Sequence, residues 1–166
     1  MANLLIVARD DLPLDERGRL PQALVHQLGR LSRRGIRLLV LAMQPEQWRP
    51  TRGTLDNALS IQQQFSQQLE SSGIHLDGVI YVSPNHAGQQ QSVNLALEDV
   101  KERYGSVEST ILLSSDTKDR DRVDNSLAQV VLLAANEAKL PGGPLAGALE
   151  RIMADLDKEP AGQAGP

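Results

Sequence analysis

Short apolar runs alternate with amphipathic segments along the sequence, and this alternation limits the possible folds more than any other feature. We predict strands at residues 4–7, 36–42, 78–83, 110–114 and 129–134. The last segment also fits part of a helix, but its β-branched pair and short length favour a strand. Strands separated by helices form a parallel sheet with helices on both faces. We therefore expect an α/β fold of three layers, doubly wound around a mostly parallel five-stranded sheet.

Between the apolar runs, apolar residues recur every three or four positions, as in helices with one buried face. We predict helices at residues 21–34, 54–72, 92–104 and 144–156. In the first helix Leu20, Leu24, Leu28 and Leu31 share a face. The apolar face of the last helix packs on the same sheet or is buried against another chain, and we favour packing on the sheet.

The length and composition suit one domain. The chain has 166 residues, of which 40% are hydrophobic, enough for one full core. We assign residues 1–157 to a single domain. The polar segment 158–166 is rich in Gly, Ala and Pro, and we expect a disordered tail there.

Several classes of function are disfavoured by composition. No apolar run approaches the roughly 18 residues of a membrane span, and no signal peptide opens the chain, so we expect a cytoplasmic protein with no membrane partner. Cysteine is absent, which excludes a thiolate zinc site. The net charge of −4 argues against a nucleic-acid partner.

Acidic residues follow two of the predicted strands. Asp10 and Asp11 come after the first strand, and Asp116 and Asp119 come after the fourth. In open α/β sheets, ligands bind beyond the carboxyl ends of the strands. Carboxylates meeting there can hold a hard cation such as magnesium and support phosphoryl transfer.

The same acids also fit a purely structural interpretation. Asp116 and Asp119 are suitable caps for a helix after the fourth strand. Asp11 and Asp15 are suitable residues for a turn before Gly18. Taken alone, the spacing favours this interpretation over a metal site.

Three strand ends carry short motifs in a recognisable order. They read Ala8-Arg9-Asp10-Asp11-Leu12, Ala42-Met43-Gln44 and Leu112-Leu113-Ser114-Ser115-Asp116. These motifs resemble Asp-x-Asp-Gly-Thr, Thr-Asn-Gln and Val-Gly-Asp of the haloacid dehalogenase-like phosphatases. Within them the chain looks most like the small branch that includes heptose bisphosphate and histidinol phosphatases. The resemblance covers most of residues 3–136 and implies a phosphatase fold without a large cap domain.

The departures from these motifs fall on the residues that carry the family's reaction. Ala8 stands where the resemblance places the nucleophilic Asp, and a methyl group cannot attack phosphorus. Asp10 corresponds to the general acid/base. Ala42 replaces the hydroxyl residue that binds phosphate, and no Lys or Arg lies between His86 and Leu95 to replace the family's phosphate-binding Lys.

The cofactor expectations follow from the same comparison. Asp10, Asp116 and Asp119 are the remaining candidates for magnesium, and without the missing Asp they predict weak binding. The Cys/His zinc loop of many relatives cannot form without cysteine. We therefore expect no cofactor, with weak magnesium binding as the exception.

The sequence best fits a catalytically degenerate phosphatase-fold protein, a pseudophosphatase with an interaction or regulatory role and another protein as its partner. Trp48 lies beside Arg49 and Arg52 in a polar loop, a composition typical of interface hot spots. The alternative is that Trp48 folds back over the sheet edge.

Two other functions stay open. One is a divergent magnesium-dependent phosphatase for a small phosphate monoester such as a sugar phosphate. Its candidate residues are Asp10 or Asp11 as nucleophile, Asp116 and Asp119 for magnesium, and Ala42, Gln44, Arg49 and Lys118 around the phosphate. The other is a non-catalytic binder of a small ligand at the same edge, although no glycine-rich phosphate loop supports it.

Overall fold

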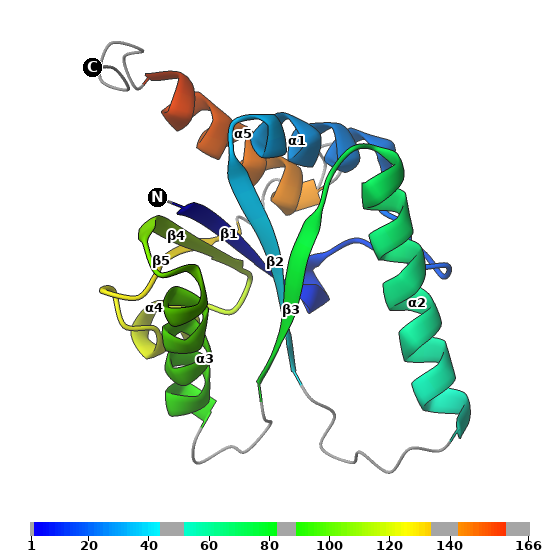
Figure 1. Cartoon of the computed structure of the whole chain (residues 1–166), viewed down its shortest axis with the longest axis horizontal. Coiled ribbons are helices and arrows are strands. Elements are labelled where there is room, and N and C mark those ends of the chain that lie inside the picture. The colour runs from blue at the N-terminus through cyan, green and yellow to red at the C-terminus, as the bar shows by residue number, and fades with distance from the viewer. Residues whose placement is uncertain (1, 44–51, 83–88, 134–142, 159–166) are drawn as a thin grey trace.

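The computed structural model describes residues 2–43, 52–82, 89–133 and 143–158 of the chain. The strands are β1 (Ala2–Ala8), β2 (Ile36–Met43), β3 (Leu76–Val82), β4 (Val107–Ser114) and β5 (Gln129–Leu132). The helices are the 3-10 turn η1 (Arg9–Asp11), α1 (Gln22–Arg33), α2 (Arg52–Ser71), α3 (Gln89–Tyr104), α4 (Asp119–Arg122) and α5 (Gly143–Lys158). Figure 1 shows their arrangement.

The strands form one sheet of five in the order β3-β2-β1-β4-β5, and every neighbouring pair is parallel. The predicted sheet is confirmed, the last segment is a strand, and the pairing is parallel throughout. In the central strand, Val7 lies opposite Val40 on one side and Leu113 on the other. The carboxyl ends of all five strands therefore meet at one edge of the sheet.

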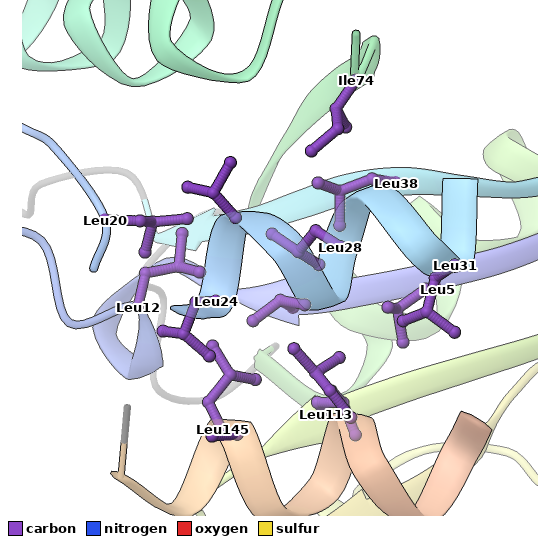
Figure 2. Packing of buried hydrophobic residues seen from close by; sticks show 14 of the residues in the cluster. Leu5, Leu12, Leu20, Leu24, Leu28, Leu31, Leu38, Ile74, Leu113 and Leu145 are labelled. Carbon is purple, nitrogen blue, oxygen red and sulfur yellow. The ribbon is translucent and has the colours of Figure 1, made fainter. Parts of the chain in front are cut away.

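Helices cover both faces of the sheet, which confirms the three layers (Figure 1). Successive side chains of β1 point to opposite faces, so Leu5 and Val7 join one core cluster and Leu4 and Ile6 the other. The first cluster includes residues of α1, α2 and α5, and Figure 2 shows part of it around Leu5. The second includes residues of α3. Both β1 faces are buried, which explains its continuous apolar run.

The last helix packs on its own domain, as favoured from the sequence. Leu145 and Leu149 of α5 are fully buried in the cluster shared with α1. Polar contacts reinforce this packing, because Gln27 Nε2 donates to Ala146 O at 3.1 Å and Arg34 pairs with Asp157 at 2.6 Å. Residues 159–166 lie outside the described ranges, so the tail stays a prediction.

Some element boundaries differ from the predictions. β4 begins at Val107, before the apolar run, because polar residues at the amino end of the sheet still pair with β1. Ser109 lies opposite Asn3 there, and its hydroxyl donates to Asn3 Oδ1 at 2.6 Å. Within the described residues there is no inserted cap domain, and no helix is long and apolar enough to cross a membrane.

Candidate functional site

The acids predicted to meet do lie together at the carboxyl edge of the sheet. A cavity of about 150 Å³ opens where β1 and β4 end side by side, and we call it the crevice. Its lining residues are Ala8, Arg9, Asp10, Asp11, Leu41, Val93, Ser114, Ser115, Asp116, Asp119 and Arg122. The crevice therefore combines the carboxylates of both strand ends with Ala8, the last residue of β1.

The end of β1 turns away from the strand direction in η1. Leu12 N–H donates to Arg9 O at 3.1 Å, which closes the turn. The carboxylate of Asp11 accepts a hydrogen bond from the backbone N–H of Ser115 at 2.9 Å, and so joins the ends of β1 and β4. Asp10 is exposed and makes no hydrogen bond or ion pair with the described residues. The two neighbouring acids therefore differ: Asp11 is tied to the fold and Asp10 is not.

Asp15 shapes the turn before Gly18, as predicted. The prediction that Asp11 also shapes this turn is wrong, because the Asp11 carboxylate binds the Ser115 N–H. The Asp15 carboxylate accepts from the backbone N–H of Arg17 at 2.8 Å and of Arg19 at 3.0 Å. These bonds favour the charged form, the one from Arg19 most strongly, and hold the pKa of Asp15 below its ordinary value. Gly18 has φ 83°, a conformation that suits glycine.

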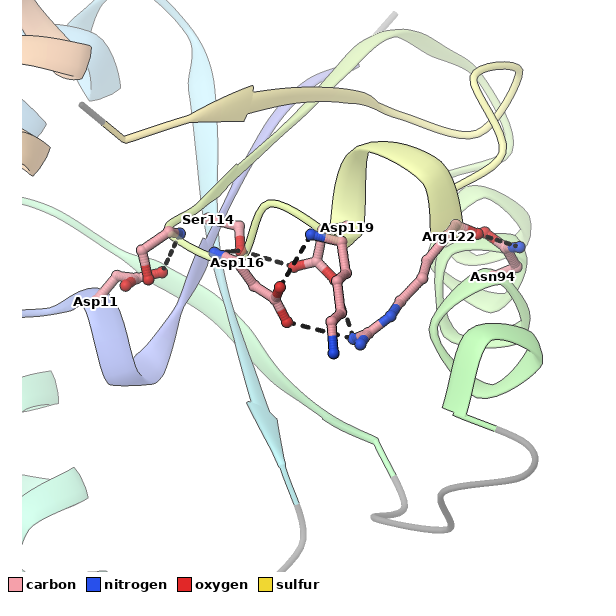
Figure 3. Close-up of polar contacts among 8 residues, drawn as sticks. Asp11, Asn94, Ser114, Asp116, Asp119 and Arg122 are labelled. Atoms are coloured by element: carbon pink, nitrogen blue, oxygen red, sulfur yellow. Dashed lines mark hydrogen bonds and ion pairs between the residues drawn. The ribbon is translucent and has the colours of Figure 1, made fainter. Parts of the chain in front are cut away.

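The end of β4 holds a closed polar network, drawn in Figure 3. The buried hydroxyl of Ser114 donates to Asp119 Oδ2 at 2.6 Å and accepts from Asp116 N–H at 3.1 Å. The guanidinium of Arg122 lies 3.4 Å from Asp116 Oδ2 and 3.5 Å from Asp119 Oδ1. Asp116 Oδ1 accepts from the Lys118 N–H at 2.9 Å. Each of the two carboxylates thus has both oxygens engaged.

Neither acid caps α4, contrary to the structural interpretation of the sequence. The N-cap of α4 is Lys118, with no side-chain cap hydrogen bond, and Asp119 lies within the first turn. Asp116 instead stabilises the preceding turn through the Lys118 N–H. The contacts of both acids are structural, as that interpretation expected. They are made with Ser114 and Arg122, however, and not with the first turn of a helix.

The backbone of α4 is fixed against α3, which places Arg122 over the acids. Asn94 Nδ2 donates to Arg122 O at 3.1 Å (Figure 3). Asn94 Oδ1 accepts from Asp124 N–H at 2.9 Å. The Arg122 side chain is only 21% exposed. The guanidinium is therefore a built part of the crevice wall.

The described carboxylates of the crevice form no ready-made magnesium site. Within the described residues, no group of three or more His, Cys, Asp or Glu side chains is placed to hold a metal ion. Magnesium takes about six oxygens in near-octahedral geometry, of which waters supply several and protein carboxylates one or two. Asp116 and Asp119 meet Arg122 instead of converging with Asp10.

Of the four predicted phosphate residues, the two that the structure describes do not line the crevice. Ala42 is buried at the end of β2, and neither it nor the exposed Lys118 lines the cavity. Gln44 and Arg49 lie outside the described residues, as does Trp48 of the predicted interface. Arg52 begins α2, but its side chain is outside the described part of the structure.

Sequence reasoning missed Ser114 and Arg122. The available signal was the spacing of Arg122 three residues after Asp119, which brings two side chains onto one face of a helix. Ser114 carried no such signal, because the last residue of an apolar strand is normally read as core.

The fold is similar to those of two solved phosphatases, in agreement with the fold that the motif resemblance implied. Among solved structures, the chain is similar to the D,D-heptose 1,7-bisphosphate phosphatase from B. bronchiseptica complexed with magnesium and phosphate. That match has a TM-score of 0.66 at 13% identity and covers 92% of this chain and 99% of the other. A putative haloacid dehalogenase-like phosphatase from Mesorhizobium loti matches with a TM-score of 0.60 at 16% identity, over 93% and 87% of the two chains.

No family model and no curated protein matches the sequence. At these identities the structural likeness establishes the fold alone. Whether the chain performs the chemistry of its structural relatives therefore depends on the residues that its own crevice contains.

Proposed function

We propose that this chain is a non-catalytic protein of the haloacid dehalogenase-like phosphatase fold, a pseudophosphatase that acts through interaction with another protein. The observation that carries the proposal is Ala8, which ends β1 and lines the crevice. A covalent phosphoryl transfer needs an attacking oxygen, and the methyl group of Ala8 supplies none. Loss of a nucleophile costs several orders of magnitude in rate.

The neighbouring acids are poor replacements for the missing nucleophile. Asp11 is held by the Ser115 N–H, so its carboxylate is oriented toward the β4 backbone. Asp10 is exposed. The lining also contains four carboxylates against two guanidinium groups, an excess of negative charge that opposes the approach of a phosphate monoester.

The same charge excess defines the partner chemistry that the crevice favours. A partner segment carrying Lys or Arg complements the carboxylates at this edge, and Asp10 has no partner of its own in the described residues. Trp48, Arg49 and Arg52 follow β2, whose carboxyl end lies at the same edge, and we propose that they contribute to the interface. We place this interaction in the cytoplasm.

An affinity purification tests the interaction with a matched pair of variants. Asp10→Arg reverses a charge in the crevice, and Glu108→Arg makes the same change at the exposed amino end of β4. We expect the wild type and Glu108→Arg to capture the same partner from the native cell, and Asp10→Arg to lose at least about tenfold of it, equivalent to 1.4 kcal/mol. Equal capture by all three proteins contradicts docking at the crevice.

A second assay tests the absence of catalysis. Purified protein is incubated with magnesium and a panel of phosphate monoesters that includes sugar phosphates, and inorganic phosphate is measured. We expect no magnesium-dependent release. Release that disappears in Asp10→Asn or Asp11→Asn establishes a divergent phosphatase instead. Thermal stabilisation by a panel compound without turnover favours a small-ligand binder.

A further inference from the structure

We infer that Arg122 is a built-in cation that takes the charge-neutralising role of the divalent metal in the crevice. The solved heptose bisphosphatase with the same fold contains magnesium, whereas the described residues of this chain form no metal-binding group. At the end of β4 the positive charge comes from the chain itself. Arg122 lies within 3.5 Å of an oxygen of both Asp116 and Asp119.

The contacts around these acids compete with a metal ion for the carboxylate oxygens. One oxygen of each carboxylate accepts from a fixed donor, the Lys118 N–H for Asp116 and the Ser114 hydroxyl for Asp119. The second oxygen of each faces Arg122. A divalent ion that binds both carboxylates through these second oxygens would have to displace the guanidinium.

The guanidinium is held by more than its ion pairs. Asn94 fixes the backbone of Arg122 from α3, and the Arg122 side chain is 79% removed from solvent, since it is 21% exposed. The guanidinium is covalently part of the chain, so this neutralisation does not depend on a bound ion. An arginine cannot bind and activate water as a metal ion does. Arg122 in place of a metal ion therefore neutralises the two carboxylates but cannot support metal-assisted chemistry.

The inference concerns the same crevice as the proposed function, but its test uses metal ions alone, with no partner protein and no substrate. A failed metal-binding test would therefore contradict the role of Arg122 without contradicting the proposed interaction, and a failed interaction test would do the reverse. The test compares wild type, Arg122→Gln and Arg120→Gln. Arg120 lies on the same helix turn, is exposed, and makes no ion pair with the described residues, so it is the matched control.

We expect 10 mM magnesium to change the Tm of the wild type and of Arg120→Gln by less than about 1 °C. Arg122→Gln leaves two carboxylates without their cation, and we expect its metal-free Tm to fall by about 2–6 °C. Magnesium then raises the Tm of this variant by about 2 °C or more, because an ion that binds only the folded state stabilises it. No rise in Arg122→Gln overturns the inference.

Two further measurements keep the inference testable if Arg122→Gln folds poorly. Arg122→Lys retains the positive charge, so we expect magnesium to leave its Tm unchanged. If magnesium raises the Tm of Arg122→Lys as much as that of Arg122→Gln, the positive charge is not what replaces the metal, and the inference is overturned. In the wild type, we expect manganese to cause no selective broadening of the amide resonances of Asp116 and Asp119. Selective broadening at micromolar manganese shows that the native crevice binds metal and also overturns the inference.

Discussion

Two polar clusters at opposite ends of the sheet each join a carboxylate to a hydroxyl and a guanidinium. At the carboxyl end, Asp119 contacts the hydroxyl of Ser114 and the guanidinium of Arg122. At the amino end, Asp77 accepts from the hydroxyl of Tyr104 at 2.5 Å and pairs with the guanidinium of Arg37 at 3.3 Å. Both carboxylates are largely buried, with Asp119 15% exposed and Asp77 10% exposed.

The amino-end cluster shows that a carboxylate, a hydroxyl and a guanidinium can meet for structural reasons alone. Ligands of α/β folds bind at the carboxyl ends of strands, so the amino-end cluster is explained by packing alone. Tyr104 adds a cation–π contact, with Arg37 5.6 Å from its ring centroid. Because the crevice repeats the same carboxylate–hydroxyl–guanidinium arrangement, its acids at β4 need no catalytic role to account for them. What distinguishes the crevice is Asp116, the adjoining cavity and Ala8.

The largest expected effect is at the centre of the crevice cluster. Asp119→Ala removes the acceptor of the buried Ser114 hydroxyl and one partner of Arg122. An unsatisfied buried hydroxyl and a broken, partly buried ion pair together cost about 2–3 kcal/mol. Urea unfolding of wild type and variant measures the free energy of unfolding. A loss below about 0.5 kcal/mol contradicts a structural role for the crevice cluster.

A smaller effect is expected at the amino-end cluster. Tyr104→Phe removes the hydroxyl that donates to Asp77 but keeps the ring beneath Arg37. Loss of one part-buried hydrogen bond to a charged acceptor that keeps its ion pair lowers the free energy of unfolding by about 1.5 kcal/mol, the low end for such bonds. The same urea experiment measures it, and a loss equal to that of Asp119→Ala makes the two clusters energetically equivalent.

Alkaline pH gives a finer test of the amino-end cluster. Burial, followed by the hydrogen bond to Asp77, raises the pKa of Tyr104 from 10.0 to about 12. The folded state therefore favours the neutral phenol. The resulting stabilisation is fully present below pH 10 and is lost as the pH rises from about 10 to 12.

The measurement compares wild type and Tyr104→Phe by urea unfolding at several pH values. Other groups titrate equally in both proteins, so the difference in unfolding free energy isolates Tyr104. We expect this difference to be constant from pH 7 to 9.5 and to shrink above pH 10. A constant difference up to pH 12 contradicts the raised pKa.

Most of the fold was predictable because central parallel strands are buried on both faces and must be apolar throughout. The runs that became β1 and β2 therefore stood out. The start of β4 did not, since Glu108 and Ser109 lie at the exposed amino end of the sheet, where pairing places no apolar demand on the side chains.

The sequence predicted those parts of the site that follow from the order and direction of the strands. Parallel pairing brings the ends of β1 and β4 together, so Asp10, Asp11, Asp116 and Asp119 were correctly expected at one edge. The role of Arg122 was not predictable, because it depends on how α4, a single turn of four residues, is fixed against α3 by Asn94. No periodicity in the sequence encodes that tertiary contact.

The smallest expected effect is at Asp10, and it sharpens the contrast within the crevice. Asp10 is exposed and makes no hydrogen bond or ion pair with the described residues, unlike the three other acids of the lining. Asp10→Asn should therefore change the free energy of unfolding by less than about 0.5 kcal/mol, as for other exposed surface positions. The urea experiment measures it beside Asp119→Ala. A loss approaching that of Asp119→Ala would show that Asp10 belongs to the structural network, and it would then no longer be available to a partner.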